Sequence, residues 1–89
     1  MVWKVELDRA AVRDLDLLNP LAAWRILALL HGCVAALDDP RSLGEALKGS
    51  TLGEFWKYRV GDYRVISSIV DKALRILVVR VGNPRDVYR

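Results

Sequence analysis

The sequence predicts an α+β fold in which an N-terminal strand and a helical hairpin precede a three-stranded antiparallel meander, in the order β-α-α-β-β-β. Apolar and polar residues alternate over residues 2–8, a pattern typical of a strand with one apolar face. Apolar residues recur at helical spacing over 9–37, and three strand-like segments joined by short turns fill 54–81. Because only the helical pair is long enough to cross between strands, we expect the hairpin to pack on one face of the sheet.

Two capping signals define the helices. Asp8 is suited to cap a short helix over 9–18. Asn19-Pro20 supplies both a cap and a proline at the first position of a second helix, expected over 20–37. This second helix should end before Asp38-Asp39-Pro40, since the residue before a proline leaves the helical region.

The second predicted helix is apolar almost all round, which is typical of a helix buried on more than one side. A four-stranded sheet and one short helix can cover only one side of it. Two interpretations therefore stay open. Either the remaining apolar stripe is a partner surface, or the alanines of this helix form a nearly neutral exposed face.

The second half of the chain is read as a loop and three strands. Residues 38–53 are rich in glycine and proline and predict a loop with one turn around 43–47. The strands that follow are expected over 54–60, 63–70 and 74–81, with turns at Gly61-Asp62 and Asp71-Lys72-Ala73.

The composition predicts one small globular domain over 1–89 with an uneven charge. The hydrophobic fraction is 53%, and the formal net charge is +3. Residues 1–54 hold six Lys/Arg against eight Asp/Glu, whereas residues 55–89 hold eight against three. A basic half beside a nearly neutral half indicates a protein that meets phosphates, and the alternative is a solvated basic sheet without a ligand.

Several classes of protein are disfavoured by what the sequence lacks. With Cys33 as its single cysteine, the chain forms no intrachain disulfide, which fits a reducing cytoplasm. The N-terminus resembles no signal peptide, and residues 20–37 fall short of the ~20 apolar residues that span a bilayer. One histidine and one cysteine are too few for an ordinary zinc site. The sequence also lacks a glycine-rich phosphate loop, so it predicts no cofactor. Any active site must therefore use Arg, Lys and Tyr.

The predicted hairpin at Gly61-Asp62 places like charges side by side. A two-residue turn there sets Arg59 opposite Arg64, with Lys57 on the same face. Such a pair destabilises a sheet by up to about 1 kcal/mol, so a fold built only for stability would avoid it. An anion bound on that face would favour the arrangement.

This residue set suits RNA cleavage by attack of a 2′-hydroxyl on the neighbouring phosphate, because the substrate supplies the nucleophile. Arginine stabilises the extra phosphate charge but does not deprotonate. Lys57 is different, because its cationic neighbours Arg59 and Arg64 are expected to disfavour its charged form. Lys57 is therefore a candidate for proton transfer together with Tyr88. Trp56, Tyr58 and Tyr63 fall on the opposite face and are expected in the core.

Four segments together resemble a known family. They are Lys48-Gly49, residues 56–65, Val81-Gly82 and the terminal Asp86-Val87-Tyr88-Arg89, and they are similar to the RelE/ParE superfamily of toxins from type II toxin–antitoxin modules. The resemblance implies a RelE-like fold, a cognate antitoxin, and a ribosome-dependent endoribonuclease (mRNA interferase) that cuts messenger RNA in the A site. The alternative within the superfamily is a ParE-like toxin that inhibits DNA gyrase by binding. A third is a toxin-fold protein that only binds its antitoxin and regulates transcription.

The resemblance also implies roles for single residues. Arg64 matches the arginine that contacts the scissile phosphate, Lys57 and Arg59 match paired basic positions, and Tyr88 matches a C-terminal tyrosine. Pro84 stands where the family commonly has a catalytic arginine, so Arg85 is the candidate for that role, and otherwise the protein is weakened, inactive or re-purposed. The predicted catalytic residues are Arg64, Arg85, Tyr88 and Lys57, and the predicted RNA-binding residues are Arg59, Lys48, Arg80 and Arg89.

Overall fold

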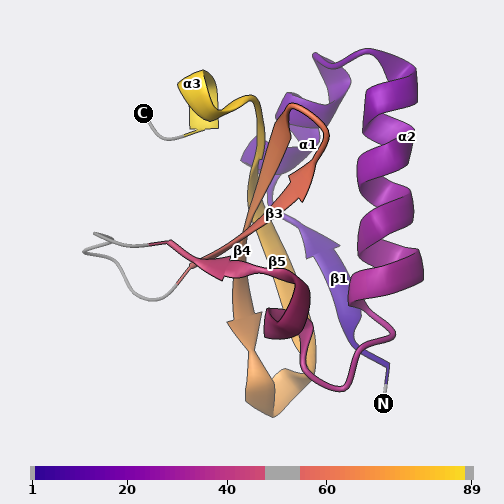
Figure 1. The fold of residues 1–89 in the computed structure, drawn as a ribbon, viewed down its shortest axis with the longest axis vertical. Coiled ribbons are helices and arrows are strands. Elements are labelled where there is room, and N and C mark those ends of the chain that lie inside the picture. Colours follow the sequence, from indigo (N-terminus) through magenta and orange to yellow (C-terminus); the bar gives the residue numbers. More distant parts are fainter. Residues whose placement is uncertain (1, 48–54, 88–89) are drawn as a thin grey trace.

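The computed structural model describes residues 2–47 and 55–87, and it confirms the α+β architecture (Figure 1). The helices are α1 (Arg9–Asp16), α2 (Pro20–Leu29), a π-helical turn over Leu30–Val34, 3-10 turns over Pro40–Leu43 and Asp71–Ala73, and α3 (Pro84–Val87). The strands are β1 (Lys4–Leu7), β2 (Glu45–Ala46), β3 (Trp56–Val60), β4 (Tyr63–Val70) and β5 (Arg75–Gly82).

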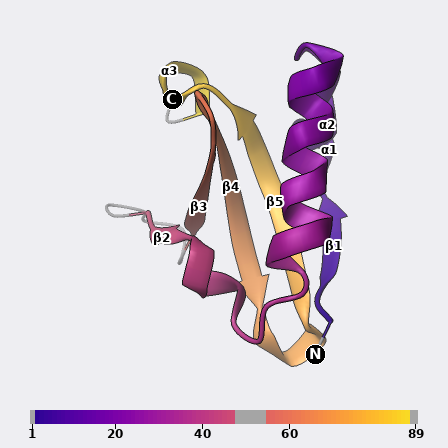
Figure 2. The same ribbon diagram turned by 45° about the vertical axis from the view of Figure 1, so that its right-hand side comes forward.

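The strands form one mixed sheet in the order β1-β5-β4-β3-β2. β1 lies parallel to β5, whereas the other neighbours are antiparallel. Figures 1 and 2 show α2 lying along one side of the sheet, with α3 on the other side. Among residues 2–47 and 55–87, only α3 lies on the second face of the sheet, where it contacts β4 and β5.

The main core lies between the helices and the sheet. Its fully buried side chains come from the second helix and from the inward positions of β3, β4 and β5, namely Ile26, Leu30, Val34, Tyr58, Val65, Ile76, Val78 and Val81. Burial of each large apolar side chain contributes roughly 1.5–3 kcal/mol. The Tyr58 hydroxyl donates a hydrogen bond to the Pro40 carbonyl (2.9 Å), and burial raises the pKa of Tyr58 to about 12.

Arg41 connects the segment before β2 to the turn between β4 and β5. Arg41 donates to both oxygens of Asp71 (3.1 and 2.7 Å) and to Asp39 (3.2 Å). Its guanidinium also lies 5.7 Å from the centre of the Trp56 ring, within the range of a cation–π contact. The hydrogen bonds between Arg41 and Asp71 lower the pKa of the Asp71 carboxyl group and raise the pKa of the Arg41 guanidinium. This cluster helps to hold β2 beside β3.

The β3–β4 hairpin confirms the predicted register. Val60 pairs with Tyr63 and Arg59 pairs with Arg64. Gly61 occupies the turn with φ +58°, a left-handed conformation that glycine adopts without strain. Asp8 and Asn19 both stand at the N-cap positions, but only the Asn19 side chain makes a capping hydrogen bond, which it accepts from the backbone N–H of Leu21 at 2.8 Å.

Three predicted elements differ from the structure. The second α-helix ends at Leu29, and its continuation is a π-helical turn over Leu30–Val34 rather than an α-helix to residue 37. The turn expected at 43–47 is a 3-10 turn at Pro40–Leu43, because Asp39 caps the N–H of Arg41 (3.1 Å) just before it. The sheet has five strands instead of four, since the two-residue β2 pairs with β3.

Within residues 2–47 and 55–87, no helix is both long enough and apolar enough to cross a membrane.

Candidate functional site

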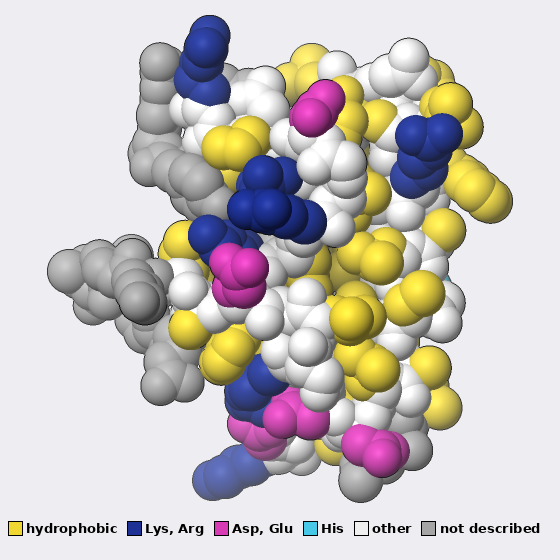
Figure 3. Space-filling model, viewed as in Figure 1, with side chains coloured by type: hydrophobic (Ala, Val, Ile, Leu, Met, Phe, Trp, Pro, Cys, Tyr) yellow, Lys and Arg dark blue, Asp and Glu magenta, His cyan; other side chains and the backbone are white. Residues whose placement is uncertain are grey.

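The face of β3 and β4 opposite the helices carries the predicted basic residues in two cross-strand rows. One row contains Arg59 and Arg64, with Gly82 beside Arg64 on β5. The adjacent row contains Lys57, Ile66 and Arg80, with Glu45 of β2 opposite Lys57. Residues two positions apart on a strand lie about 7 Å apart, so the two rows are neighbours, and Ile66 in the centre of the second row is buried. Figure 3 shows dark blue Lys and Arg side chains gathered near the β3–β4 hairpin, beside an acidic one.

Arg64 is held in place by the hairpin that carries it. Its Nη1 donates to the carbonyls of Gly61 (3.2 Å) and Tyr63 (2.9 Å), and the side chain is half-buried. These bonds turn the guanidinium towards backbone carbonyls and offset its repulsion from Arg59. Arg59 itself is exposed and makes no ion pair with the described residues. Positive charge from this pair therefore faces solvent on the sheet face opposite the helices.

A carboxylate that the sequence did not indicate lies on the same face. Glu45 Oε2 is 3.5 Å from Lys57 Nζ, and the two residues are directly opposite in the β2–β3 register. Lys57 is the more buried partner, with a side chain 26% exposed against 66% for Glu45. The basic site thus also contains a group able to accept a proton. A two-residue strand carries no periodic pattern, so only the long-range pairing identifies Glu45.

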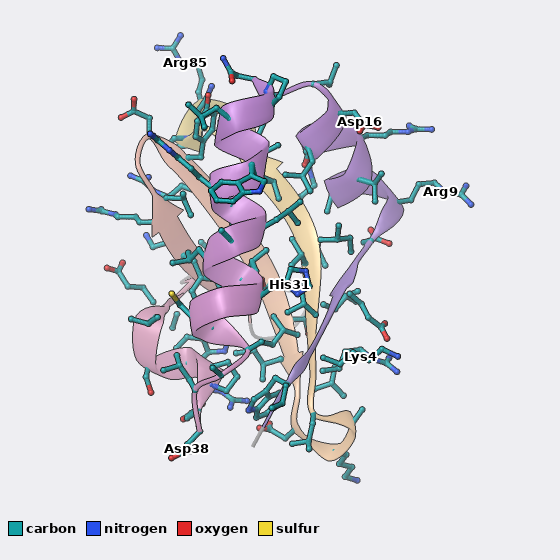
Figure 4. All side chains as sticks on the ribbon, turned by 90° about the vertical axis from the view of Figure 1, so that its right-hand side faces the viewer. Lys4, Arg9, Asp16, His31, Asp38 and Arg85 are labelled. Carbon is teal, nitrogen blue, oxygen red and sulfur yellow. The ribbon has the colours of Figure 1, made fainter. Side chains whose placement is uncertain are left out.

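The segment after β5 leads from Gly82 to α3 at the same end of the molecule as the hairpin. Pro84 begins α3, and the Val87 N–H donates to the Asn83 carbonyl (3.2 Å). Ile66 and Val87 are both buried outside the main core, which indicates that α3 covers Ile66 on this face. Arg85 is exposed and points outwards from this end in Figure 4. Since Gly82 is the register partner of Arg64, α3 starts only two residues beyond the Arg59–Arg64 row.

The remaining predicted residues fall into two groups. Arg80 lies in the row of Lys57, and its guanidinium is paired with Asp14 of α1 (Nε–Oδ2, 2.8 Å). Lys48, Tyr88 and Arg89 lie outside the described residues, so their roles stay predictions. Tyr58 is buried in the main core and Tyr63 packs against it, as predicted, whereas Trp56 is half-buried outside the core cluster and lies beside Arg41.

The arrangement can bind and polarise a phosphate and exchange a proton beside it. Among residues 2–47 and 55–87, no group of three or more His, Cys, Asp or Glu side chains is arranged to hold a metal ion. His31 and Cys33 are exposed on the helical side of the sheet (Figure 4 for His31). The described side chains of the two rows offer guanidinium, ammonium and carboxylate groups.

Sequence comparison connects this chain with toxins. A family described as "ParE toxin of type II toxin-antitoxin system, parDE" matches residues 5–88. Toxin RelG of Mycobacterium tuberculosis is 28% identical over 89 residues, which cover 100% of this chain and 99% of that protein.

Structural comparison gives the same relationship. The RelBE2 toxin–antitoxin complex of Mycobacterium tuberculosis contains a chain with a TM-score of 0.83 and 24% identity, covering 97% of this chain and 95% of that one. A chain of the archaeal RelE–RelB complex of Pyrococcus horikoshii has a TM-score of 0.73 and 26% identity, with 98% and 99% covered. The chain therefore belongs to the ParE toxin family of type II toxin–antitoxin systems, within the RelE/ParE superfamily, and has a RelE-like fold.

Proposed function

We propose that this toxin is an endoribonuclease that cleaves messenger RNA on the ribosome. The observation that carries the proposal is the Arg59–Arg64 pair beside the Lys57–Glu45 ion pair on one open sheet face. A surface that only had to be soluble would not place two arginines opposite each other. A surface that acts on a phosphodiester uses both the positive charge and the adjacent proton acceptor.

The two arginines are assigned to the phosphate. When the 2′-oxygen attacks, the phosphorus gains a fifth ligand and the non-bridging oxygens gain negative charge. Arg64 is already oriented by the hairpin carbonyls, so little reorganisation is needed when this charge develops. Arg59, exposed in the same row, binds the same phosphate from the β3 side.

The proton transfers are assigned to the second row and to the C-terminus. The 2′-hydroxyl loses its proton to the Glu45 carboxylate while the bond from 2′-oxygen to phosphorus forms. The bond from phosphorus to the 5′-oxygen breaks, and a proton from Lys57 or Tyr88 neutralises the leaving 5′-oxygen. The products are a 2′,3′-cyclic phosphate and a 5′-hydroxyl, and the nucleophile comes from the RNA itself.

Arg85 is assigned the role that the family commonly gives to the arginine at the position of Pro84. Its place on the first turn of α3, three residues after the Arg59–Arg64 row ends at Gly82, supports this assignment. The proline fixes the backbone at the start of α3, and so sets the direction in which Arg85 leaves it.

Programmed ribosomes provide the direct test. We expect the wild-type protein to cut the messenger in the A site and to leave a 2′,3′-cyclic phosphate end. Arg64→Ala should lower the rate by about 10²-fold or more, the usual loss for one transition-state donor. Cleavage at an unchanged rate by this variant would contradict the assignment.

The second candidate is a ParE-like inhibitor of DNA gyrase, which the description of the matching family favours. In that case the wild-type protein would block supercoiling by purified gyrase and would leave ribosome-bound messenger intact. The two assays on one preparation therefore separate the two functions. A protein that is inactive in both assays but still binds its antitoxin and the operator DNA would be the third alternative, a toxin-fold protein that only regulates transcription.

We also propose a cognate antitoxin as the partner in the cytoplasm. Several similar chains are seen in complexes with RelB antitoxins. This chain exposes three large apolar side chains around the start of α2, Leu17 (85%), Leu21 (58%) and Trp24 (67%), which favours the partner-surface interpretation of the apolar stripe. Figure 3 shows hydrophobic side chains over α2 on that side.

The test of the partner surface is Trp24→Glu. We expect weaker antitoxin binding and better solubility of the isolated toxin, with an unchanged cleavage rate. A variant that binds the antitoxin as tightly as the wild type would place the interface elsewhere, for example along the sheet edge.

A further inference from the structure

The C-terminal end of β5 extends beyond the strand that covers its outer edge. The parallel β1–β5 register ends at Leu7 and Val78, and the Asp8 N–H donates to the Val78 carbonyl at 2.8 Å. Among the described residues, no strand pairs with the outer edge of β5 after Val78. Helix α1 lies there instead and contacts β5.

One carboxylate of α1 takes the place of the missing strand. Asp14 Oδ2 accepts from the backbone N–H of Val81 (2.8 Å) and from Arg80 Nε (2.8 Å), while Oδ1 accepts from Arg80 Nη2 at 3.4 Å. The Asp14 side chain is only 15% exposed. Hydrogen bonds to a charged acceptor are stronger than those between neutral groups, so this junction is a strong polar contact.

The junction lies where β5 is least regular. The β4–β5 register shifts between Ile66 and Ser67, because Arg80 pairs with Ile66 and Val78 pairs with Ser67, which leaves Val79 as an additional residue. A bulge of this kind disrupts the ladder locally and bends the strand. The end of β5 therefore needs an external contact to keep one position, and Asp14 supplies it.

That end of β5 is also what connects the two parts of the proposed site. Val81 precedes Gly82, the register partner of Arg64, and Gly82 leads through Asn83 to α3 and Arg85. A small rotation at Val81 would move Arg85 relative to Arg64. The position of one proposed charge-stabilising arginine with respect to the other thus depends on the Asp14 carboxylate.

We infer that Asp14 is a positioning residue of the toxin, which acts through Val81 and Arg80 to set Arg85 against the Arg59–Arg64 pair. The inference rests on the proposed ribonuclease function. It also gives Arg80 a role different from direct phosphate binding, since its guanidinium aligns the end of β5 through Asp14.

The test compares Asp14→Asn, nearly the same in shape but uncharged, with Asp16→Asn as the matched control. Asp16 is on the same helix but exposed, and Figure 4 shows it at the surface. On programmed ribosomes we expect Asp14→Asn to lower kcat about 10-fold or more with KM changed less than twofold. Asp16→Asn should leave both constants unchanged, and Asp14→Glu should recover part of the lost kcat.

A second measurement separates positioning from stability alone. In the catalytically weakened Arg64→Ala background, amide hydrogen exchange should become at least 10-fold faster at Val81 when Asp14 is replaced, and the Gly82 and Arg85 amide signals should shift. The Tyr58 and Val65 amides should keep their exchange rates. If Asp14→Asn lowers the melting temperature but leaves kcat, KM and the Arg85 signals unchanged, the residue is merely structural and the inference is wrong.

Failure of the proposed function would look different. If the wild-type protein does not cleave messenger RNA at all, the ribonuclease assignment is wrong. The exchange and chemical-shift data then decide whether Asp14 fixes the path from β5 to α3. Unchanged Gly82 and Arg85 signals in Asp14→Asn would overturn the inference in that case too.

Discussion

The two faces of the β3–β4 hairpin differ sharply although they share the same ten or so backbone positions. On the helix side, Tyr58 and Val65 pair across the strands and are fully buried. On the open side, the next pair is Arg59 with Arg64, two like charges directly opposite each other across the strands. Since neighbouring residues of a strand point to opposite faces, stability and the proposed activity are assigned to alternate residues of one hairpin. Substitutions can therefore change one property with little effect on the other.

The largest effect on stability is expected from the core. Leu30→Ala should lower the free energy of unfolding by about 2–5 kcal/mol, because Leu30 is fully buried between the helices and the sheet. Denaturant titration measures this change. Leu21→Ala on the exposed side of the same helical segment is the control and should change stability by less than about 0.5 kcal/mol. Equal losses in both variants would show that the helix packs differently.

The next largest effect concerns α3. Arg85→Ala should lower cleavage of ribosome-bound messenger by about 10²-fold if Arg85 stabilises the phosphorane. Pro84→Arg should then change the rate little. If the proline at position 84 has instead lowered the cleavage rate, Arg85→Ala will have almost no effect and Pro84→Arg will raise the rate sharply. Single-turnover cleavage by the two variants distinguishes these outcomes.

A loss of similar size is expected at the proton acceptor. Glu45→Gln should lower the cleavage rate by about 10²-fold, the lower end of the 10²–10⁴-fold that general base catalysis usually contributes, because Lys57 and Tyr88 remain in place. The variant should bind RNA at least as well as the wild type, because it removes a negative charge from the basic face. Wild-type rates in Glu45→Gln would show that another group accepts the proton.

Local alternation and turn chemistry explain which parts of this architecture could be predicted from sequence. Gly61-Asp62 and the alternation around it were enough to set Arg59 opposite Arg64 and to place Tyr58 in the core. The capping residues Asp8 and Asn19 located the starts of the helices for the same reason, since the signals are local.

Contacts between short, distant segments could not be predicted. β2 consists of two residues, so neither it nor the Glu45–Lys57 pair has a periodic signal. The Asp14–Arg80 contact joins residues 66 positions apart and depends on where α1 lies relative to β5. The helix end at Leu29 was missed because the sequence stays apolar and helix-compatible through the π-helical turn.

The smallest effect is a dependence of stability on alkaline pH. The pKa of Tyr58 rises from 10.0 to about 12 on burial, so the folded state holds the phenolic proton more tightly than the unfolded state does. Its contribution to stability is complete below pH 10 and is lost as the pH rises from 10 towards 12. Tyr58→Phe should cost about 1 kcal/mol at neutral pH through the lost bond to Pro40. Unfolding curves from pH 8 to 11.5 should then show a weaker alkaline decline in the variant than in the wild type.

The central claim is tested most directly by two neighbouring residues of β4. Arg64→Ala and Val65→Ala change opposite faces of one strand, and both the unfolding free energy and the cleavage rate on programmed ribosomes are measured for each. We predict that Arg64→Ala loses about 10²-fold in rate and changes stability by less than about 1 kcal/mol. Val65→Ala should lose about 2 kcal/mol of stability while its folded fraction cleaves at the wild-type rate. Full cleavage by Arg64→Ala, or a loss of rate in Val65→Ala as large as in Arg64→Ala, would contradict the assignment of function to the open face.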